Sequence, residues 1–191
     1  MNDECTAPFD GGNISKVGEY LDLVEVRVLR ALSSEAVQGS CSITLLLVFA
    51  TIDALGKLTH PRAKAGAGER FRYFLDFMGE EYKQRSKELW KLRNALVHNV
   101  INVESYLSST ELKGWVHLQP IRGGRFVYVN SRLASRNLMA AFGRVKTLLA
   151  TDRNAWRQAE ERLEWVENTL QAMSSDPSPT PPPPVQFIQA P

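Results

Sequence analysis

Apolar residues recur every three or four positions along most of the chain, which is the spacing of one face of an α-helix. The first such stretch runs from about Ser15, a suitable N-cap, to about Ala36. The second, from about Ser42 to Leu58, is apolar on nearly every side and therefore predicts the central helix of a core. Four further helices are predicted over residues 69–78, 80–99, 131–150 and 152–173. Asn130 or Ser131 can cap the third of these, and Asp152 can cap the last.

The pattern changes between about residues 113 and 130. Two short runs there, 115–118 and 126–129, are rich in β-branched and aromatic residues, and they flank the dipeptide Gly123-Gly124. Such runs around a glycine-containing turn predict a β-hairpin inserted between two helices.

The two ends of the chain lack this periodicity. Residues 1–14 contain Pro8, Gly11 and Gly12, so we expect a flexible N-terminal lead. Residues 175–191 are rich in proline and predict a disordered tail. The expected fold class is therefore all-α, with one domain over residues 15–174 built as a bundle of five to six helices with a single inserted β-hairpin.

Composition narrows the classes of function. The hydrophobic fraction of 43% is that of an ordinary globular protein, and a net charge of +2 means that nucleic-acid binding would need a local basic patch. Cys5 and Cys41 have no neighbouring metal ligands, so neither a metal nor another cofactor is expected. The chain opens without a signal-peptide pattern, and its longest apolar run, 43–52, is about half as long as a membrane span. We expect a cytoplasmic protein that does not enter the membrane.

The fourth predicted helix carries the most informative residues, within the run Lys91–His98. Arg93 lies in the middle of the apolar arc of this helix, and a guanidinium cannot lose its charge, so it needs a partner. Asn94 and His98 are four residues apart and share a face, whereas Arg93 and His98 are about 140° apart around the axis. The arginine can bend toward His98, or it can meet a second copy of the helix from another subunit.

The sequence Arg93-Asn94-Ala95-Leu96-Val97-His98 resembles the R-x4–6-H motif of HEPN domain proteins, in which a polar residue, here Asn94, commonly follows the arginine. The aromatic and aliphatic residues that flank it, from Tyr82 through Trp90, also resemble that family. The resemblance would cover residues 15–174 and implies a helical bundle that dimerises through the motif helix. Many members are metal-independent endoribonucleases of toxin–antitoxin, CRISPR and phage-defence systems.

The resemblance also implies a role for each residue of the motif. His98 would act as general acid or base while an RNA 2′-hydroxyl attacks the adjacent phosphate. Arg93 would donate hydrogen bonds to that phosphate, and Asn94 would orient the histidine or the phosphate. The arginine and histidine of two subunits would form one composite site, so the implied partners are a second copy of the chain, an RNA substrate and a cognate antitoxin.

Asp53 is the expected partner of Arg93, because it ends the apolar run of the core helix and a buried carboxylate needs an opposite charge. Such a pair either anchors the guanidinium for catalysis or bridges two helices structurally. Two alternatives to an active nuclease therefore stay open. One is a catalytically inactive HEPN-fold module that binds RNA or a partner protein. The other is a helical scaffold with no nucleic-acid role.

Other polar and aromatic residues have simpler interpretations. His60 is expected in a solvated turn, and His117 on the exposed face of the hairpin. Trp165 is expected to extend a stripe of core residues on the last helix. Basic residues form either a solvated face or an RNA-contacting surface near the motif helix; they are Arg62, Lys64, Arg70, Arg72, Lys83, Arg85 and Lys87.

Overall fold

The computed structural model of the chain describes residues 15–98, 107–108, 114, 116–121, 123–124 and 126–175. This part of the chain is mostly helical, which confirms the expected all-α class. The predicted N-terminal lead (1–14) and the proline-rich tail from residue 176 onward lie outside the described residues.

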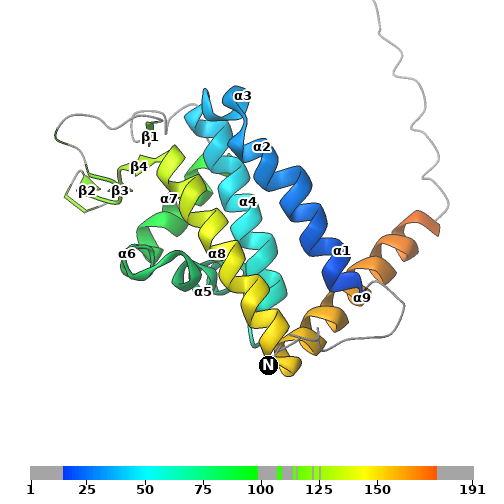
Figure 1. Cartoon of the computed structure of the whole chain (residues 1–191). Coiled ribbons are helices and arrows are strands. Elements are labelled where there is room, and N and C mark those ends of the chain that lie inside the picture. The colour runs from blue at the N-terminus through cyan, green and yellow to red at the C-terminus, as the bar shows by residue number, and fades with distance from the viewer. Residues whose placement is uncertain are drawn as a thin grey trace, which may run out of the picture.

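Helix α4 (Cys41–Thr59) is the central helix of the bundle, as its apolar sequence predicts (Figure 1). It begins where the Ser40 hydroxyl accepts a hydrogen bond from the backbone N–H of Ile43, and it ends before Pro61. By length and composition alone, α4 is also the one helix of the described residues that could cross a membrane. More than half of it is buried within the bundle, as in the core helix of a globular domain.

The first predicted helix is confirmed in part. Helix α1 (Lys16–Leu23) continues through a π-helical segment, η1 (Val24–Leu29), into α2 (Arg30–Ser33). The helix ends at Ser33 rather than near Ala36, because the hydroxyl of Ser34 bonds back to the carbonyl oxygen of Ala31. A short helix, α3 (Glu35–Gln38), then leads to α4.

Helix α5 (Ala67–Met78) crosses α4 at very close range. A Cβ atom at Gly56 would lie 2.6 Å from the backbone oxygen of Arg70, so only glycine fits at this crossing. The predicted fourth helix is two helices, α6 (Glu80–Gln84) and α7 (Ser86–His98). They are separated at Arg85, whose backbone leaves the helical region with φ −100° and ψ 15°.

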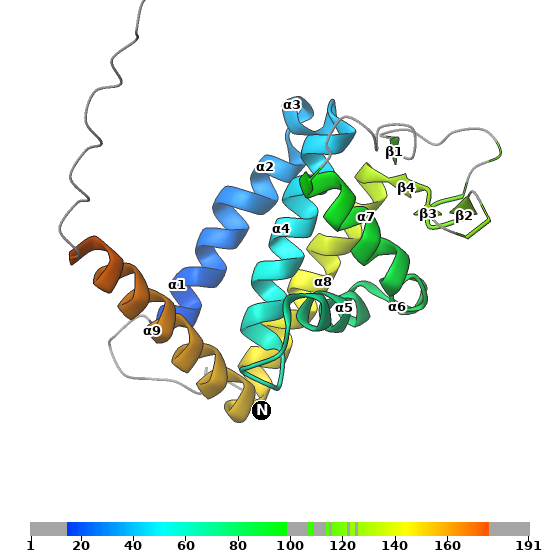
Figure 2. The same ribbon diagram turned by 180° about the vertical axis from the view of Figure 1, so that it is seen from behind.

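The last two helices begin at the predicted caps. The Asn130 side chain accepts backbone N–H groups at the start of α8 (Ser131–Thr151). The carboxylate of Asp152 does the same for α9 (Arg153–Ser175). Figure 2 shows α4 between the α1–α2 helix on one side and α7 on the other, with α9 crossing one end of the bundle.

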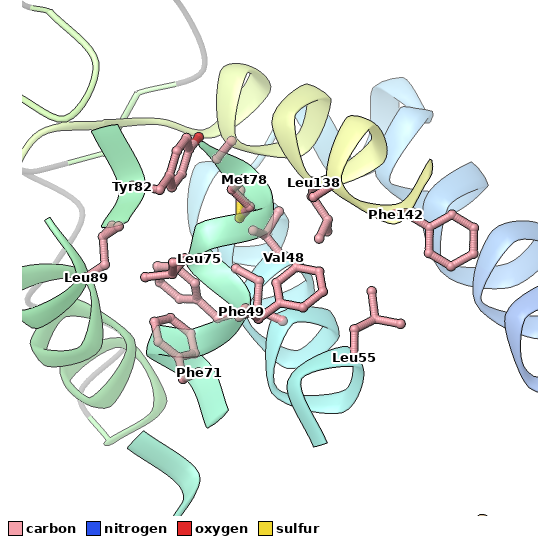
Figure 3. Packing of buried hydrophobic residues seen from close by; sticks show 14 of the residues in the cluster. Val48, Phe49, Leu55, Phe71, Leu75, Met78, Tyr82, Leu89, Leu138 and Phe142 are labelled. Atoms are coloured by element: carbon pink, nitrogen blue, oxygen red, sulfur yellow. The ribbon is translucent and has the colours of Figure 1, made fainter. Parts of the chain in front are cut away.

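The main core lies where α4, α5, α7 and α8 meet, as Figure 3 shows. Two of its aromatic rings, those of Phe49 and Phe71, pack edge to face with centroids 5.6 Å apart. The other residues labelled there are buried and come from these helices and from α6; they are Val48, Leu55, Leu75, Met78, Tyr82, Leu89, Leu138 and Phe142.

The predicted hairpin is present but shorter than expected. Strands β2 (Pro120–Ile121) and β3 (Phe126–Val127) pair antiparallel, and Gly123 and Gly124 turn between them with positive φ angles of 67° and 79°. Residues 116–118, expected in the first strand, form a turn instead, with Leu118 at φ 63°. The run 126–129 continues into β4 (Val129–Asn130), which pairs in parallel with β1 (Leu107–Ser108).

Candidate functional site

Arg93 of α7 and Asp53 of α4 form an ion pair across the two helices. The carboxylate oxygen Oδ2 of Asp53 accepts hydrogen bonds from Nη2 of Arg93 at 2.6 Å and from Nε at 3.0 Å. The two side chains are 23% and 25% exposed, so the pair is neither sealed in the core nor free in solvent. The expected partner of Arg93 is therefore the observed one, and the pair lies at the surface of the bundle.

The guanidinium of Arg93 also contacts Asn94 and Trp90. Its Nη1 donates to Oδ1 of Asn94 at 3.1 Å, and its central carbon, Cζ, lies 5.2 Å from the ring centre of Trp90. Within the described residues, these bonds use three of the five N–H groups of the guanidinium and leave two. Trp90 packs directly against Gly68 of α5, where a Cβ atom would lie 3.0 Å from the indole.

An open hollow of about 490 Å³ adjoins the ion pair, between α4, α7 and the start of α5. We call it the Arg93 pocket. Its polar lining consists of Asp53, Arg93, Lys57 and Arg70. Its apolar lining includes Leu46, Phe49, Ala50 and Val97. With three cationic groups and one carboxylate, the pocket favours an anion.

Lys57 is a pocket residue that the sequence did not single out. It follows Asp53 by four positions, so the two share one face of α4. That spacing is the signal that could have identified it. Arg70 is one of the basic residues expected on the surface, and its Nη1 donates to the carbonyl oxygen of Ala65 at 2.9 Å.

His98 is not brought to the pocket within one chain. It is the last residue of α7, is exposed to solvent and is not among the lining residues of the Arg93 pocket. The structure therefore brings together Arg93, Asn94 and Asp53 and leaves His98 about one helical turn beyond them.

An exposed apolar face borders the pocket on α4 and α7. Val97 of α7 is 45% exposed and Ile43 of α4 is 51% exposed, and Ala50, about two turns after Ile43 on α4, is exposed as well. Exposed apolar side chains on the motif helix and on the neighbouring α4 suit an interaction surface.

The expectation for His117 is wrong, because this histidine is held in a polar cluster rather than on an exposed face. Its Nδ1 accepts the backbone N–H of Asn130 at 3.0 Å, and its Nε2 lies 2.8 Å from the hydroxyl oxygen of Tyr82. The same oxygen accepts a hydrogen bond from the side chain of Asn137 in α8. Burial lowers the pKa of His117 to about 4, so the ring is neutral near pH 7.

Two further expectations are corrected. His60 is buried rather than solvated, because the turn at Pro61 folds its ring against the ring of Tyr73, 4.8 Å away. Its Nδ1 accepts the backbone N–H of Arg62, and burial lowers the pKa of the ring. Trp165 does not extend the core, since its side chain is 61% exposed beside Lys57.

Within the described ranges, no group of three or more His, Cys, Asp and Glu side chains is placed to hold a metal ion. Comparisons with models of protein families, with curated proteins and with solved structures found no match to this chain.

Proposed function

We propose that the protein is a metal-independent endoribonuclease of the HEPN type, which acts as a homodimer in the cytoplasm as part of a toxin or defence system. One observation carries this proposal. The Arg93 guanidinium, held by Asp53 and Asn94, borders an open pocket, and two of its N–H groups make no hydrogen bond to the described residues. An arginine fixed in this way can bind a phosphate in two-point fashion.

The charges around the pocket suit an RNA backbone. Lys57 and Arg70 add two positive charges near Arg93, and Asp53 balances only one of the three. A phosphate diester carries one negative charge, and more accumulates on its oxygens as the 2′-hydroxyl attacks. Arg93 would stabilise that charge most strongly in the transition state, which is the condition for catalysis.

His98 would provide the proton transfers. As general base it would take the proton of the 2′-hydroxyl, whose oxygen then bonds to phosphorus while the bond to the 5′-oxygen breaks. A protonated imidazole would return a proton to that leaving oxygen, and the products would be a 2′,3′-cyclic phosphate and a free 5′-hydroxyl. Histidine suits both steps because its ordinary pKa, near 6.5, makes both forms accessible at neutral pH.

A homodimer is proposed because one chain holds His98 away from the pocket. The apolar face formed by Ile43, Ala50 and Val97 borders the same pocket, so a second copy bound there would carry its own α7 toward it. The site would then combine Arg93 of one subunit with His98 of the partner subunit. A cognate antitoxin could inhibit the enzyme by covering this face.

A second function has its own support. The pairing of Arg93 with Asp53 and the distance of His98 from the pocket also suit a catalytically inactive module of the same fold that binds RNA or a partner protein. Such a module would bind RNA, and replacing His98 would leave its affinity for RNA unchanged.

Cleavage of a labelled single-stranded RNA, with EDTA present, separates the two functions. His98→Ala is expected to slow cleavage by a factor of about 100 or more, which is the usual contribution of general acid–base catalysis. Arg93→Lys keeps the charge but loses the fork of donors, and a loss of comparable size is expected. Lys91→Ala, an exposed change on the same helix, is the control. An all-deoxy strand must stay intact because it has no 2′-hydroxyl.

The dimer is tested with the same assay and with light scattering in solution. Ile43→Asp is expected to give monomers and to abolish cleavage, although Ile43 is not among the residues that line the Arg93 pocket. Val26→Asp is the matched control, because Val26 is equally exposed, at 49%, on a different helix. Toxicity on expression in cells should follow the cleavage rates. Cleavage by a protein that stays monomeric, or equal cleavage by wild type and His98→Ala, would overturn the proposal.

A further inference from the structure

A second pocket, of about 780 Å³, opens between the end of α4, the loop after it and α9. We call it the Trp165 pocket. Its volume lies within the range of about 300–1,000 Å³ that is usual for sites of small ligands. Lys57 and Arg70 line both this pocket and the Arg93 pocket, so the two are neighbours.

The charge of the Trp165 pocket is strongly positive. Four cationic side chains line it, Lys57, Lys64, Arg70 and Arg162, against the single carboxylate of Glu161. Arg162 is committed to the fold, because its guanidinium donates to the carbonyl oxygens of Leu58 and His60 at the end of α4. Lys64 lies in the exposed loop before α5. The pocket therefore favours an anionic ligand.

The pocket also has an aromatic surface. The indole of Trp165 is 61% exposed, and the ammonium group of Lys57 lies 4.8 Å from its ring centre. A large aromatic side chain this exposed, beside several cations, is the combination found where proteins bind single-stranded nucleic acids. The base stacks on the ring, and the phosphate contacts the cations.

We propose that the Trp165 pocket binds one nucleotide unit, with the base stacked on Trp165 and the phosphate on Lys57, Lys64 and Arg70. The unit belongs either to an RNA strand that continues from the Arg93 pocket or to a free nucleotide. Where it belongs to the strand, the inference rests on the proposed function, because the strand is then the substrate.

Binding is measured so that catalysis plays no part. The probe is a fluorescein-labelled 12-nucleotide RNA with 2′-O-methyl groups throughout, which cannot be cleaved because the attacking hydroxyl is blocked. Its anisotropy reports the dissociation constant of the full chain. Adenosine monophosphate is the second probe, followed by quenching of tryptophan fluorescence in the wild type and in Trp165→Phe.

The variants separate stacking from charge. Trp165→Ala is expected to weaken RNA binding about tenfold, which is typical of losing one stacked base, while Trp165→Phe keeps a ring and should stay within about twofold. Lys64→Gln is expected to reduce the salt dependence of binding by the equivalent of about one phosphate contact. Lys146→Gln is the matched control, since Lys146 is an exposed lysine paired with Glu25 on another face. Thermal melting confirms that each variant folds.

Loss of RNA affinity in Trp165→Ala without quenching by adenosine monophosphate would identify a unit of the strand. Quenching by adenosine monophosphate in the wild type but not in Trp165→Phe would identify a free nucleotide. Either result supports the proposed nucleotide site. Unchanged RNA affinity in Trp165→Ala, together with no quenching dependent on Trp165, would overturn it. A protein that binds through Trp165 but fails to cleave RNA would refute only the proposed nuclease.

Discussion

Two polar clusters, built from similar groups, differ in how they meet solvent. In the first, Tyr82, His117 and Asn137 join α6, the segment before β2 and α8 through hydrogen bonds around one hydroxyl oxygen. In the second, Arg93 and Asp53 join α7 to α4 beside an open pocket. The first cluster keeps a histidine neutral by burial. The second keeps a charged guanidinium about a quarter exposed.

This difference indicates which of the two clusters can bind a ligand. A cluster whose polar groups bond to one another around a buried tyrosine stabilises the fold and has few hydrogen-bonding groups left for a ligand. A half-exposed cluster with spare donors contributes less to stability and can exchange solvent for substrate. We therefore expect changes in the Tyr82 cluster to affect mainly folding, and changes in the Arg93 cluster to affect mainly RNA cleavage.

The largest expected effect on stability is a pH dependence caused by His117. Its pKa is about 4 in the folded chain and about 6.5 in the unfolded chain, so the unfolded state takes up a proton first as the pH falls. This stabilisation is complete above pH 6.5 and is lost between pH 6.5 and 4, by up to about 3 kcal/mol.

Urea unfolding at several pH values measures that loss. In His117→Gln the new side chain cannot be protonated, so the unfolding free energy should depend much less on pH between 6.5 and 4. A smaller slope will remain, because burial also lowers the pKa of His60. Identical slopes in the two proteins would contradict the assigned role of His117.

A smaller loss is expected for Tyr82→Phe. The variant removes the oxygen that Asn137 and His117 share and leaves both side chains without that partner. We expect the free energy of unfolding to fall by about 1–2 kcal/mol, measured by urea titration. Tyr20→Phe is the control, since the hydroxyl of Tyr20 makes no hydrogen bond with the described residues, and its loss should be below about 0.5 kcal/mol.

The smallest effect on stability is expected for Asp53→Asn. An ion pair that is partly exposed contributes only about 0–1 kcal/mol, so the unfolding free energy should change little. Cleavage of RNA should fall about tenfold or more, because the guanidinium loses the carboxylate that fixes its position. Asp22→Asn, at an exposed position of α1, should change neither quantity. A stability loss as large as that of Tyr82→Phe would erase the contrast between the clusters.

Much of the fold could be predicted from periodicity and caps. The core helix follows from its apolar sequence, and the caps at Asn130 and Asp152 follow from the preference of helix starts for such side chains. The partner of Arg93 follows from the need of a charge in an apolar surface for an opposite charge. The break at Arg85 could not be predicted, because the apolar spacing continues across it and packing decides the backbone there.

The sites were harder to predict than the helices. His117 alternates with apolar residues in the sequence, yet a turn at Leu118 replaces the strand that this alternation suggested, so its side chain points to Tyr82. Lys57 and Trp165 are 108 positions apart in the numbering and meet only because α9 crosses the end of α4. Contacts of that range are set by tertiary packing and leave no local pattern.

Gly56 gives the α4–α5 crossing a consequence beyond packing. Asp53 and Lys57, which lie before and after Gly56 on α4, line the Arg93 pocket together with Arg70. The backbone of Arg70 can come this close to α4 only because Gly56 has no Cβ atom, which would lie 2.6 Å from the Arg70 carbonyl oxygen. The spacing between the cations is thus fixed by a missing methyl group. Any larger side chain at this position would push Arg70 outward and change which anion fits, although no group that touches the anion had been altered.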